Sequence, residues 1–459
     1  MRTEFDSLGP VEIPDGAYYG VQSYRAMQNF PITGNKMLPE MIVSLAQIKK
    51  ACAQANCEAG DMTEEISSAI VRACDEIIAG ALHDQFIVDP IQGGAGTSAN
   101  MNANEVIASR ATELLGGKLG EKLVHANDHV NMAQSTNDVY PSAGKLTTLK
   151  LIKGLLKALD SLKIAFEKKA EEFKDIIKLG RTQLQDAVPV HLGQEFGAYA
   201  AALERGIQRI RLSRQELYAL NLGATAIGTC INTSPVYLKT VVPYLATETR
   251  DPFYQARNLI DATQNPDGFV EVSAAVKNCA LILSKISNDL RLMSSGPRGG
   301  LGEITLPARQ HGSSIMPGKI NPVMPEVVSQ VAFRIAGNDV AIGMAAEAGQ
   351  LELNAFEPVL FHCLFESITM LTNVSKVFED YCVAGIIANV DRCKANLFNS
   401  TAMATALNPI IGYEAATKIV KTALHDNRQI LDVAVEILQE KGMTKEQVEK
   451  IFDDCVANC

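Results

Sequence analysis

The sequence predicts a mainly α-helical fold in which long helices form a multi-helix bundle. Three observations support this class. Hydrophobic residues make up 47% of the 459 residues, aromatic residues only 6%, and Trp is absent, so the core is mostly aliphatic, as packed helices prefer. Several segments much longer than an ordinary helix repeat apolar residues at helical spacing. No region is dominated by strand patterns.

Residues 1–135 form the first predicted domain, a set of short helical stretches joined by irregular loops. Gly9-Pro10, Pro14-Asp15-Gly16 and the turn Gly93-Gly94-Ala95-Gly96 interrupt regular structure there. A chain of this length must either divide into domains or build one unusually long architecture. The change from loops to long periodic segments places the boundary near residue 135.

Residues 136–388 form the predicted central domain of long helices. The first helix runs from about Tyr140 to Leu179, with Pro141 suited to its first turn. A helix of about 40 residues would be about 60 Å long. Three further segments have the same periodicity: His191 to Leu220, Phe269 to Ser295, and Pro322 to about Asp380 with interruptions near Gly337 and Pro358.

Helices this long rarely bury themselves alone, so we expect them to bundle with helices from other copies of the chain. A monomeric helical domain is the alternative. Residues 389–459 contain short amphipathic helices and a Lys-, Glu- and Asp-rich end. They form the third predicted domain, small and helical.

Charge and cysteine usage narrow the range of partners. The formal net charge is −10, from 42 Lys and Arg against 52 Asp and Glu that are mixed along the chain, which disfavours nucleic acid or an anionic membrane. The N-terminus has no signal-peptide core, and no apolar run is long enough to span a bilayer. The ten cysteines are irregularly spaced without a CxxC pair, which predicts reduced thiols in a cytoplasmic protein.

Three polar stretches stand out where an ordinary helix would carry aliphatic residues. Each has an ordinary explanation: a glycine turn, a helix cap and a solvated loop between helices, respectively. The second stretch leads into the first long helix, and a helix N-terminus is also a ready carboxylate site. The stretches are Gly93–Asn100 with Thr97; Asn131–Asp138 with Ser135, Thr136 and Asn137; and Gly180–Pro189 with Thr182 and Gln183.

A fourth stretch, Gly296 to Pro322, has six glycines and four prolines and cannot be regular helix. Long loops between packed helices usually bind, gate or fold over a site. Within it, Ser313 and Ser314 precede Lys319 and Asn321, and a cation and an amide beside two hydroxyls suit an anionic substrate. Because no metal-ligand cluster, phosphate-binding loop or dinucleotide fingerprint competes, we expect no metal site and no resident cofactor.

These stretches together resemble the aspartase/fumarase superfamily. Gly312–Pro322, GSSIMPGKINP, is similar to its signature loop, and the similarity covers nearly the whole chain. The resemblance implies the fold of that superfamily, with a homotetramer whose active sites are each assembled from three subunits. The other matching stretches are Tyr18–Val21, Thr97, Ser135-Thr136-Asn137, Thr182, Asn221–Ala226 and Gly337-Asn338.

Within the superfamily the details resemble the aspartase branch. Thr136 stands where class II fumarases usually carry a second Ser, and both Gly180–Pro189 and Met344–Leu351 are similar to aspartase segments. This implies reversible elimination of ammonia from L-aspartate to give fumarate, with Mg²⁺ activation left open. A class II fumarase acting on L-malate is the alternative, and an inactive scaffold like the eye-lens relatives is a third interpretation.

The resemblance also implies a role for each site residue. Ser313 would remove the proton, and because a serine hydroxyl is a poor base in water, Lys319 and backbone N–H donors must lower its pKa. The remaining roles divide between the two carboxylates and the amine. Thr97, Ser135, Thr136 and Ser314 would hold the carboxylate that takes up charge; Thr182, Lys319 and Asn321 the other carboxylate; and Asn137, Gln183 and Thr97 the amine.

Four residues depart from the pattern of the superfamily or have a role that the resemblance leaves open. Many fumarases and some aspartases carry His where this chain has Gln183, and Gln cannot shuttle a proton, which fits ammonium as a leaving group better than hydroxide. Glu326 matches the carboxylate that pairs with that His, so its role here is open. His125 and Asp128 are similar to a secondary carboxylate site of fumarases, although a surface histidine is the ordinary explanation.

Overall fold

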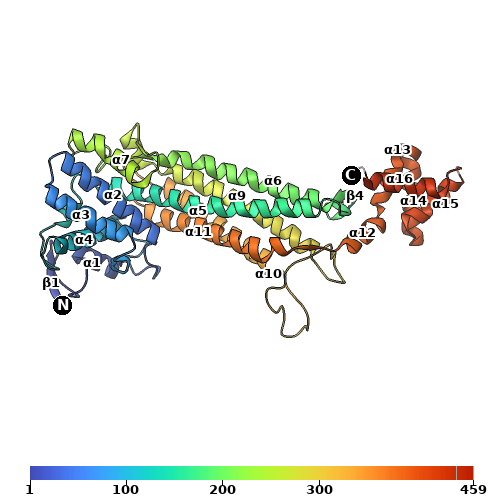
Figure 1. Ribbon diagram of the computed structural model, residues 1–459, viewed down its shortest axis with the longest axis horizontal. Helices are drawn as coiled ribbons and strands as arrows, with labels where there is room; N and C mark the ends of the chain where they lie inside the picture. The colour runs from blue at the N-terminus through green and yellow to red at the C-terminus, as the bar shows by residue number, and fades with distance from the viewer. Residues whose placement is uncertain (441, 458–459) are drawn as a thin grey trace. The chain divides into compact units, whose positions relative to one another are not determined.

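The computed structural model describes residues 1–440 and 442–457 and confirms a mainly α-helical fold (Figure 1). The helices before residue 250 are α1 (Val21–Asn29), α2 (Pro39–Glu58), α3 (Glu64–Ile78), α4 (Thr97–Leu114), α5 (Thr136–Glu172), α6 (Leu192–Ser213) and α7 (Pro235–Thr249). Those after it are α8 (Leu259–Gln264), α9 (Asp267–Met293), α10 (Val323–Glu347), α11 (Glu357–Tyr381), α12 (Val390–Phe398), α13 (Asn408–Ile411), α14 (Tyr413–Asp426), α15 (Ile430–Gln439) and α16 (Lys445–Ala457).

Strands are short and occur in two-stranded sheets within the described part of the chain. Antiparallel pairs are β1 (Arg2–Asp6) with β2 (Gly9–Ile13), β3 (Ile177–Thr182) with β4 (Gln185–His191), and β7 (Ile304–Thr305) with β8 (Ile387–Ala388). The parallel pair is β5 (Ala219–Leu220) with β6 (Tyr254–Gln255).

The chain divides into two compact units, each described by itself. Unit 1 comprises residues 1–156, 208–278 and 333–371, and unit 2 comprises residues 157–207, 279–332 and the chain from Thr372 onward. The divisions fall inside the five long helices α5, α6, α9, α10 and α11. The three-domain division expected at residues 135 and 388 stays a prediction.

In unit 1 the long helices pack side by side through aromatic and polar contacts. The Phe361 ring of α11 lies 5.2 Å from Tyr140 of α5 and 4.9 Å from Phe269 of α9, measured between ring centroids. Asp339 of α10 accepts a 2.7 Å hydrogen bond from Ser273 of α9. These contacts hold α5, α9, α10 and α11 of this unit together.

In unit 2 the packing is similar. Phe166 of α5 lies 6.3 Å from Phe196 of α6 and 6.2 Å from Phe378 of α11, in tilted and edge-on geometries that aromatic rings favour. The helices α14 to α16 form a further hydrophobic cluster, which also includes Ile177 and Leu179 of β3. The C-terminal helices therefore share a core with the β3–β4 hairpin.

Three expectations about the long helices were wrong in detail. The second long helix, α6, ends at Ser213 rather than near Leu220, and a 3-10 turn and β5 follow it. The first helix ends at Glu172 rather than near Leu179, and the polar segment after it is the β3–β4 hairpin, not a loop. Gly337 lies inside α10, and the break falls at residues 348–356, just before Pro358. A single glycine costs a helix only about 1 kcal/mol, which long-helix packing readily outweighs.

Pro141 lies inside α5, not in its first turn, because the helix already begins at Thr136. Proline lacks an N–H, so the carbonyl of Asn137, four residues earlier, has no intrahelical donor. Asn221 supplies one: its Nδ2 donates to the Asn137 carbonyl at 2.9 Å. The segment after β5 therefore completes the hydrogen bonding of this helix start.

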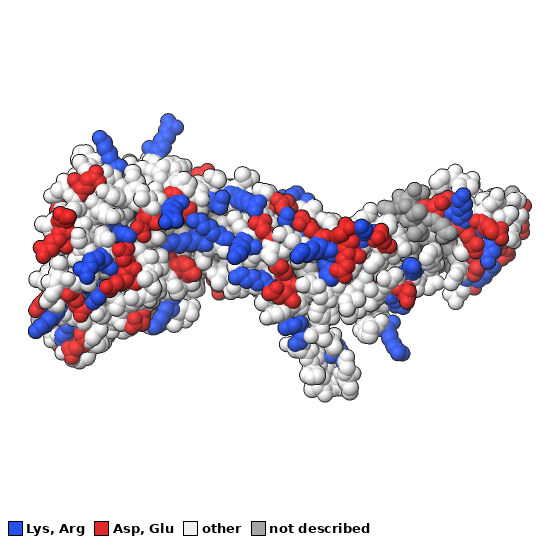
Figure 2. Space-filling model, in the orientation of Figure 1, with Lys and Arg blue, Asp and Glu red and all other residues white. Residues whose placement is uncertain are grey.

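The structure also bears on charge and cysteines. Figure 2 shows Lys and Arg interspersed with Asp and Glu over the face in view. No described helix is both long and apolar enough to cross a bilayer. The eight cysteines with described side chains form no disulfide bond, as expected, while the Cys455 side chain and Cys459 lie outside the described residues.

Candidate functional site

The N-terminus of α5 is organised by reciprocal capping, as one interpretation of its polar run expected. Ser135 Oγ accepts from the Asn137 N–H at 3.2 Å, and Asp138 Oδ1 accepts from the Ser135 N–H at 3.0 Å. This is a variant of the capping box in which the cap hydroxyl accepts from the second rather than the third N–H of the helix. It leaves the Ser135 hydroxyl hydrogen available to donate outward at a helix end that attracts anions.

The Asn221–Ala226 segment, which like the start of α5 belongs to unit 1, holds this helix start in place. Asp138 Oδ2 accepts from the N–H groups of Gly223 and Thr225, both at 3.0 Å. Asn137 Nδ2 donates to the Ala226 carbonyl at 2.7 Å. Asn137 Oδ1 is therefore left as an acceptor that suits an ammonium group, while the second Nδ2 hydrogen stays available as a donor.

Thr97, the first residue of α4, also presents a hydrogen-bond acceptor, like Asn137 Oδ1. Its hydroxyl donates to the Gly94 carbonyl at 2.6 Å, so only its lone pairs remain for another partner. The preceding Gly96 has a φ of 87°, and a Cβ there would lie 2.4 Å from the Tyr140 ring, so only glycine fits this turn. Thr97 is thus placed as an acceptor for an amine, which favours the second of its two predicted roles.

Thr136, in contrast, presents a hydrogen-bond donor. Its Oγ1 accepts from Asn100 Nδ2 at 3.2 Å, and it is 9% exposed. Within the described chain its own hydroxyl hydrogen has no acceptor. We call Thr97, Ser135, Thr136 and Asn137 the unit 1 half-site: Thr97 and Asn137 present acceptors, Ser135 and Thr136 present donors.

Lys49 and Asp138, which contact residues of this half-site or its neighbouring loop, are fully buried, and sequence reasoning foresaw Asp138 as a helix cap but missed Lys49. Burial lowers the pKa of Lys49 in α2 to about 8, and burial raises the pKa of Asp138 to about 6 against three backbone N–H donors that lower it. Lys49 Nζ donates to Gln134 Oε1 at 2.7 Å and Asn131 Oδ1 at 3.0 Å. A lysine in an amphipathic helix ordinarily indicates an exposed position, so the sequence carried no signal for it.

In unit 2, Thr182 and Gln183 lie at the exposed tip of the β3–β4 hairpin. Gln183 and Leu184 form its two-residue loop with φ values of 52° and 62°, as tight hairpins require. Both residues are less tolerant of this conformation than Gly or Asn. The backbone therefore holds the predicted amine contact in a defined, locally strained position.

A buried ion cluster anchors that hairpin. Glu303, with 0% exposure, accepts from Arg181 Nη1 at 2.7 Å and lies 3.2 Å from Lys178 Nζ. Lys178 also pairs with Glu195 of α6 at 2.9 Å. Two cations and two carboxylates compensate each other here, which a buried cluster requires. The cluster joins the strand that ends in Thr182 to the start of the segment that carries Ser313.

Ser313 lies in a coil segment of unit 2 that Figure 1 shows leading into α10. Its Oγ accepts from the N–H groups of Ile315 and Met316, both at 3.1 Å. Two backbone donors on one oxygen stabilise its negatively charged form, as in an oxyanion site. The structure thus supplies the N–H donors that the sequence argument required for a serine base.

The ends of this loop are tied together. The Gly312 N–H donates to the Lys319 carbonyl at 3.0 Å, and Asn321 Nδ2 donates to the Gly312 carbonyl at 2.9 Å. Lys319 itself is exposed, as are Ser314 and the apolar Ile315 and Ile320, at 85% and 56%. Hydrogen bonds therefore join the two ends of this loop, and the residues between them present a serine, a lysine and apolar side chains to solvent.

The structure thus gathers the predicted residues into three sets. The unit 1 half-site joins Thr97, Ser135, Thr136 and Asn137, because the N-termini of α4 and α5 meet at the Asn100–Thr136 hydrogen bond. In unit 2, Ser313, Ser314, Lys319 and Asn321 share one loop, and Thr182 with Gln183 occupies the hairpin tip. Among the described residues, no hydrogen bond joins that tip to the loop.

Two residues with open roles have local partners. Glu326, in the first turn of α10, lies 4.0 Å from Arg291. His125 Nδ1 accepts from the Asp128 N–H at 3.1 Å and so caps the π-helical turn Ala126–Val130. This capping contact gives His125 a structural partner. The described residues contain no cluster of three or more metal-ligating side chains.

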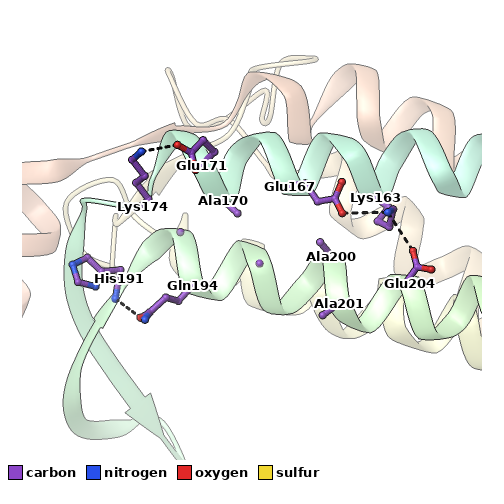
Figure 3. A pocket seen from close by; sticks show the side chains of 12 residues that line it. Lys163, Glu167, Ala170, Glu171, Lys174, His191, Gln194, Ala200, Ala201 and Glu204 are labelled. Atoms are coloured by element: carbon purple, nitrogen blue, oxygen red, sulfur yellow. Dashed lines mark hydrogen bonds and ion pairs between the residues drawn. The ribbon is translucent and has the colours of Figure 1, made fainter. Parts of the chain in front are cut away.

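An open groove between α5 and α6 of unit 2 contains none of the predicted site residues (Figure 3). Lys163 pairs with Glu167 and Glu204, each at 3.2 Å, and Lys174 pairs with Glu171 at 2.6 Å. Three carboxylates against two ammonium groups give this groove no excess positive charge. It does not suit a dicarboxylate.

A bundle of long helices with a serine loop of this kind is consistent with an enzyme of the lyase class. Two family comparisons agree with that assignment. Residues 9–337 match the family described as Lyase, and residues 403–454 match the family described as Fumarase C C-terminus. The chain belongs to this lyase family, the aspartase/fumarase superfamily, as its sequence predicted.

Individual relatives are similar over nearly the whole chain. An aspartate ammonia-lyase of Bacillus subtilis is 53% identical, covering 98% of this chain and 95% of the relative, and that of Escherichia coli is 46% identical with the same coverage. A fumarate lyase:delta crystallin from Brucella melitensis bound to cobalt is 47% identical with a TM-score of 0.95, covering 99% of this chain and 98% of that one. A class II fumarase of Schistosoma mansoni is 34% identical with a TM-score of 0.93, covering 98% of both chains.

Proposed function

We propose that this chain is an aspartate ammonia-lyase that converts L-aspartate reversibly into fumarate and ammonia. The carrying observation is the polarity of the unit 1 half-site, which offers Thr97 and Asn137 as acceptors beside the donors Ser135 and Thr136. An ammonium group next to a carboxylate fits this pattern. The identity of about half over full length to aspartate ammonia-lyases, against 34% to the class II fumarase, supports the same choice.

Ser313 is the proposed base. Its oxyanion, held by the Ile315 and Met316 N–H groups, takes a proton from the carbon next to the side-chain carboxylate of aspartate. The electron pair moves into that carboxylate, which becomes doubly charged. Ser135, Thr136 and Ser314 donate hydrogen bonds to it, and Thr97 takes part only through the neighbouring amine. Preorganised donors stabilise this developing charge at little reorganisation cost.

The leaving group then departs. The electron pair returns to form the carbon–carbon double bond, the carbon–nitrogen bond breaks, and ammonia leaves the acceptors Thr97 and Asn137. The proton held by Ser313 is released, so the products balance as fumarate and ammonium. Gln183 contacts the amine without transferring a proton, because an amide does not titrate.

The second carboxylate is held by Thr182, Lys319 and Asn321. The Asn321 amide is engaged with the Gly312 carbonyl in this structure, so binding exchanges an internal hydrogen bond for one to substrate. Closure of the loop brings Ser313 to the substrate and excludes water. We propose that these steps need no resident cofactor, with activation by Mg²⁺ left open. Addition of a chelator tests this, and loss of all turnover would contradict it.

We further propose a cytoplasmic homotetramer with active sites shared between subunits. Support comes from α10, where Phe333, Val340 and Met344 lie on one helical face in unit 1 with 65%, 62% and 69% exposure. Apolar stripes of this kind mark protein interfaces. Free cysteines in the described chain suit a reducing compartment.

The test of function is a single incubation followed by proton NMR. The purified protein is mixed with fumarate and ammonium chloride in water, where two nucleophiles compete. Aspartate as the product supports the proposal. Malate as the product, with no aspartate, would contradict the proposal and indicate class II fumarase activity.

A further inference from the structure

Asn100, Asn131 and Lys49 form a chain of hydrogen bonds that ends at Thr136. Lys49 Nζ donates to Asn131 Oδ1 at 3.0 Å. Asn100 Nδ2 donates to the same oxygen at 3.1 Å and to Thr136 Oγ1 at 3.2 Å. Lys49 and Asn100 have 0% and 1% exposure, so water does not compete for these contacts.

The direction of every bond in this chain follows from its first member. Below its pKa of about 8 the Lys49 amine is protonated and can only donate, so the atom of Asn131 that faces it is its oxygen. The atom of Asn100 that faces this oxygen must then be the amide nitrogen. That nitrogen has two hydrogens, and the second one points at Thr136 Oγ1. Thr136 must accept, and its own hydrogen is left to donate elsewhere.

A second observation shows that this direction is enforced. Asn131 Oδ1 also accepts from Asn104 Nδ2 at 3.1 Å, so one carbonyl oxygen has three buried donors. Asn100 Oδ1 is buried and has no hydrogen-bond partner among the described atoms. Leaving a buried acceptor unpaired is costly. If the Asn100 amide were rotated by 180°, its Oδ1 would face Asn131 Oδ1, and the two oxygens would repel each other. Leaving Asn100 Oδ1 without a partner therefore costs less free energy than this repulsion.

We propose that Asn100 is a positioning residue that forces the Thr136 hydroxyl to donate to the substrate carboxylate, with Asn131 and Lys49 setting its direction. This rests on the proposed function, because it assumes that Thr136 contacts a carboxylate. A threonine hydroxyl can either donate or accept, and a carboxylate needs a donor. This series of hydrogen bonds prevents the Thr136 hydroxyl from acting as an acceptor toward the substrate before the substrate binds, which is a form of preorganisation.

The test is a double-mutant cycle between Asn100→Asp and Thr136→Val. Asn100→Asp keeps the shape but replaces the donor by an acceptor, so Thr136 donates inward and faces the substrate with lone pairs. We expect kcat/KM for L-aspartate to fall about 10- to 100-fold, the range for a hydrogen bond to a charged group. In the Thr136→Val background the same change should alter kcat/KM by no more than about two-fold.

Asn104→Asp is the matched control. Asn104 lies one helical turn further along α4 and donates to the same Asn131 oxygen, but it does not contact Thr136. Its substitution makes the same chemical change in the same buried cluster. We expect its effect on kcat/KM to be additive with that of Thr136→Val. Equal and additive effects of Asn100→Asp and Asn104→Asp would overturn the proposal and reduce Asn100 to a core residue.

Two measurements keep the outcome clear. If thermal melting shows that Asn100→Asp does not fold, the cycle is repeated with Asn131→Leu, which interrupts the chain without adding charge and carries the same expectation. The inhibition constant of succinate, a dicarboxylate without an amine, is measured alongside. It should rise with Asn100→Asp whichever substrate the wild type converts, so an error in the proposed function would not hide a result here.

Discussion

Thr97 and Thr136 have the same side chain, yet their hydrogen bonds give them opposite roles in the proposed reaction. Thr97 donates to the Gly94 carbonyl and keeps only lone pairs for a ligand, whereas Thr136 accepts from Asn100 and keeps its hydrogen. The sequence could place both residues near a ligand by resemblance. It could not assign their polarity, because that depends on partners elsewhere in the fold.

This polarity leads to a prediction for Thr97→Val. Valine has the same shape but no lone pairs, so the ammonium of aspartate loses one acceptor. We expect kcat/KM for L-aspartate to fall about 10-fold or more. The inhibition constant of succinate should stay unchanged because succinate has no amine. A parallel loss of succinate binding would show that Thr97 contacts a carboxylate instead.

Ser313 gives the sharpest prediction at this scale. Alanine at this position removes the oxygen that the Ile315 and Met316 N–H groups hold. Turnover should fall by about 10²- to 10⁴-fold or more, as for loss of a general base. Succinate binding and the melting temperature should be retained because the loop is exposed. Near wild-type turnover would exclude Ser313 as the base.

At the scale of elements, the sequence predicted the long helices well because their apolar periodicity extends over many turns. The helices α5, α6, α9 and α11 begin or end within a few residues of the expected positions, except at the C-terminal ends of α5 and α6, which were each placed seven residues too late. The end of α5 was missed because the β3–β4 hairpin is polar and mostly exposed from Thr182 to Val188, so it resembled a loop. The hairpin is held by the Glu303 cluster, which joins residues more than 100 positions apart, and by the hydrophobic core that Ile177 and Leu179 share with the C-terminal helices.

Gly337 illustrates the opposite error. A glycine within an apolar run predicted an interruption, but α10 continues through it. A Cβ at Gly337 would have nothing within 4 Å in this chain. Neighbouring contacts of Asn338, whose Nδ2 donates to Cys363 O at 3.2 Å and Ser367 Oγ at 3.0 Å, hold the helix here. Tertiary contacts of this kind are invisible to local propensity.

The first turn of α11 leads to a prediction about pH. Burial raises the pKa of the Glu357 carboxyl from 4.5 to about 8. Between these values the folded protein keeps a proton that the unfolded chain releases, so the free energy of unfolding falls by about 1.4 kcal/mol per pH unit. The contribution is fully present below pH 4.5 and is lost as the pH rises through about 8.

Glu357→Gln should remove this slope because glutamine stays neutral. At about pH 5 the variant and the wild type should unfold at similar urea concentrations. At about pH 8 the variant should be more stable by about 1 to 3 kcal/mol, after allowance for relaxation of the buried site. Protein concentration must be held constant. An equal difference at both pH values would mean that Glu357 does not titrate in this range.

At the scale of the whole molecule, the exposed stripe on α10 carries the prediction about assembly. A charge at Met344, which is 69% exposed, would be buried without a partner in a subunit interface. We expect Met344→Glu to reduce the mass measured by light scattering and to lower turnover, because the proposed sites are shared. Met344→Leu keeps the apolar surface and should remain assembled. A wild-type protein that scatters as a monomer would contradict this account.

The most direct test of the central claim is the ultraviolet absorbance of fumarate formed by the purified protein. L-aspartate and L-malate are supplied in parallel samples, and the Ser313→Ala variant serves as the blank. The account predicts fumarate from L-aspartate, little or none from L-malate, and none from the variant with either substrate. Fumarate from L-malate but not from L-aspartate would contradict it, and would show that the acceptors Thr97 and Asn137 do not select an amine.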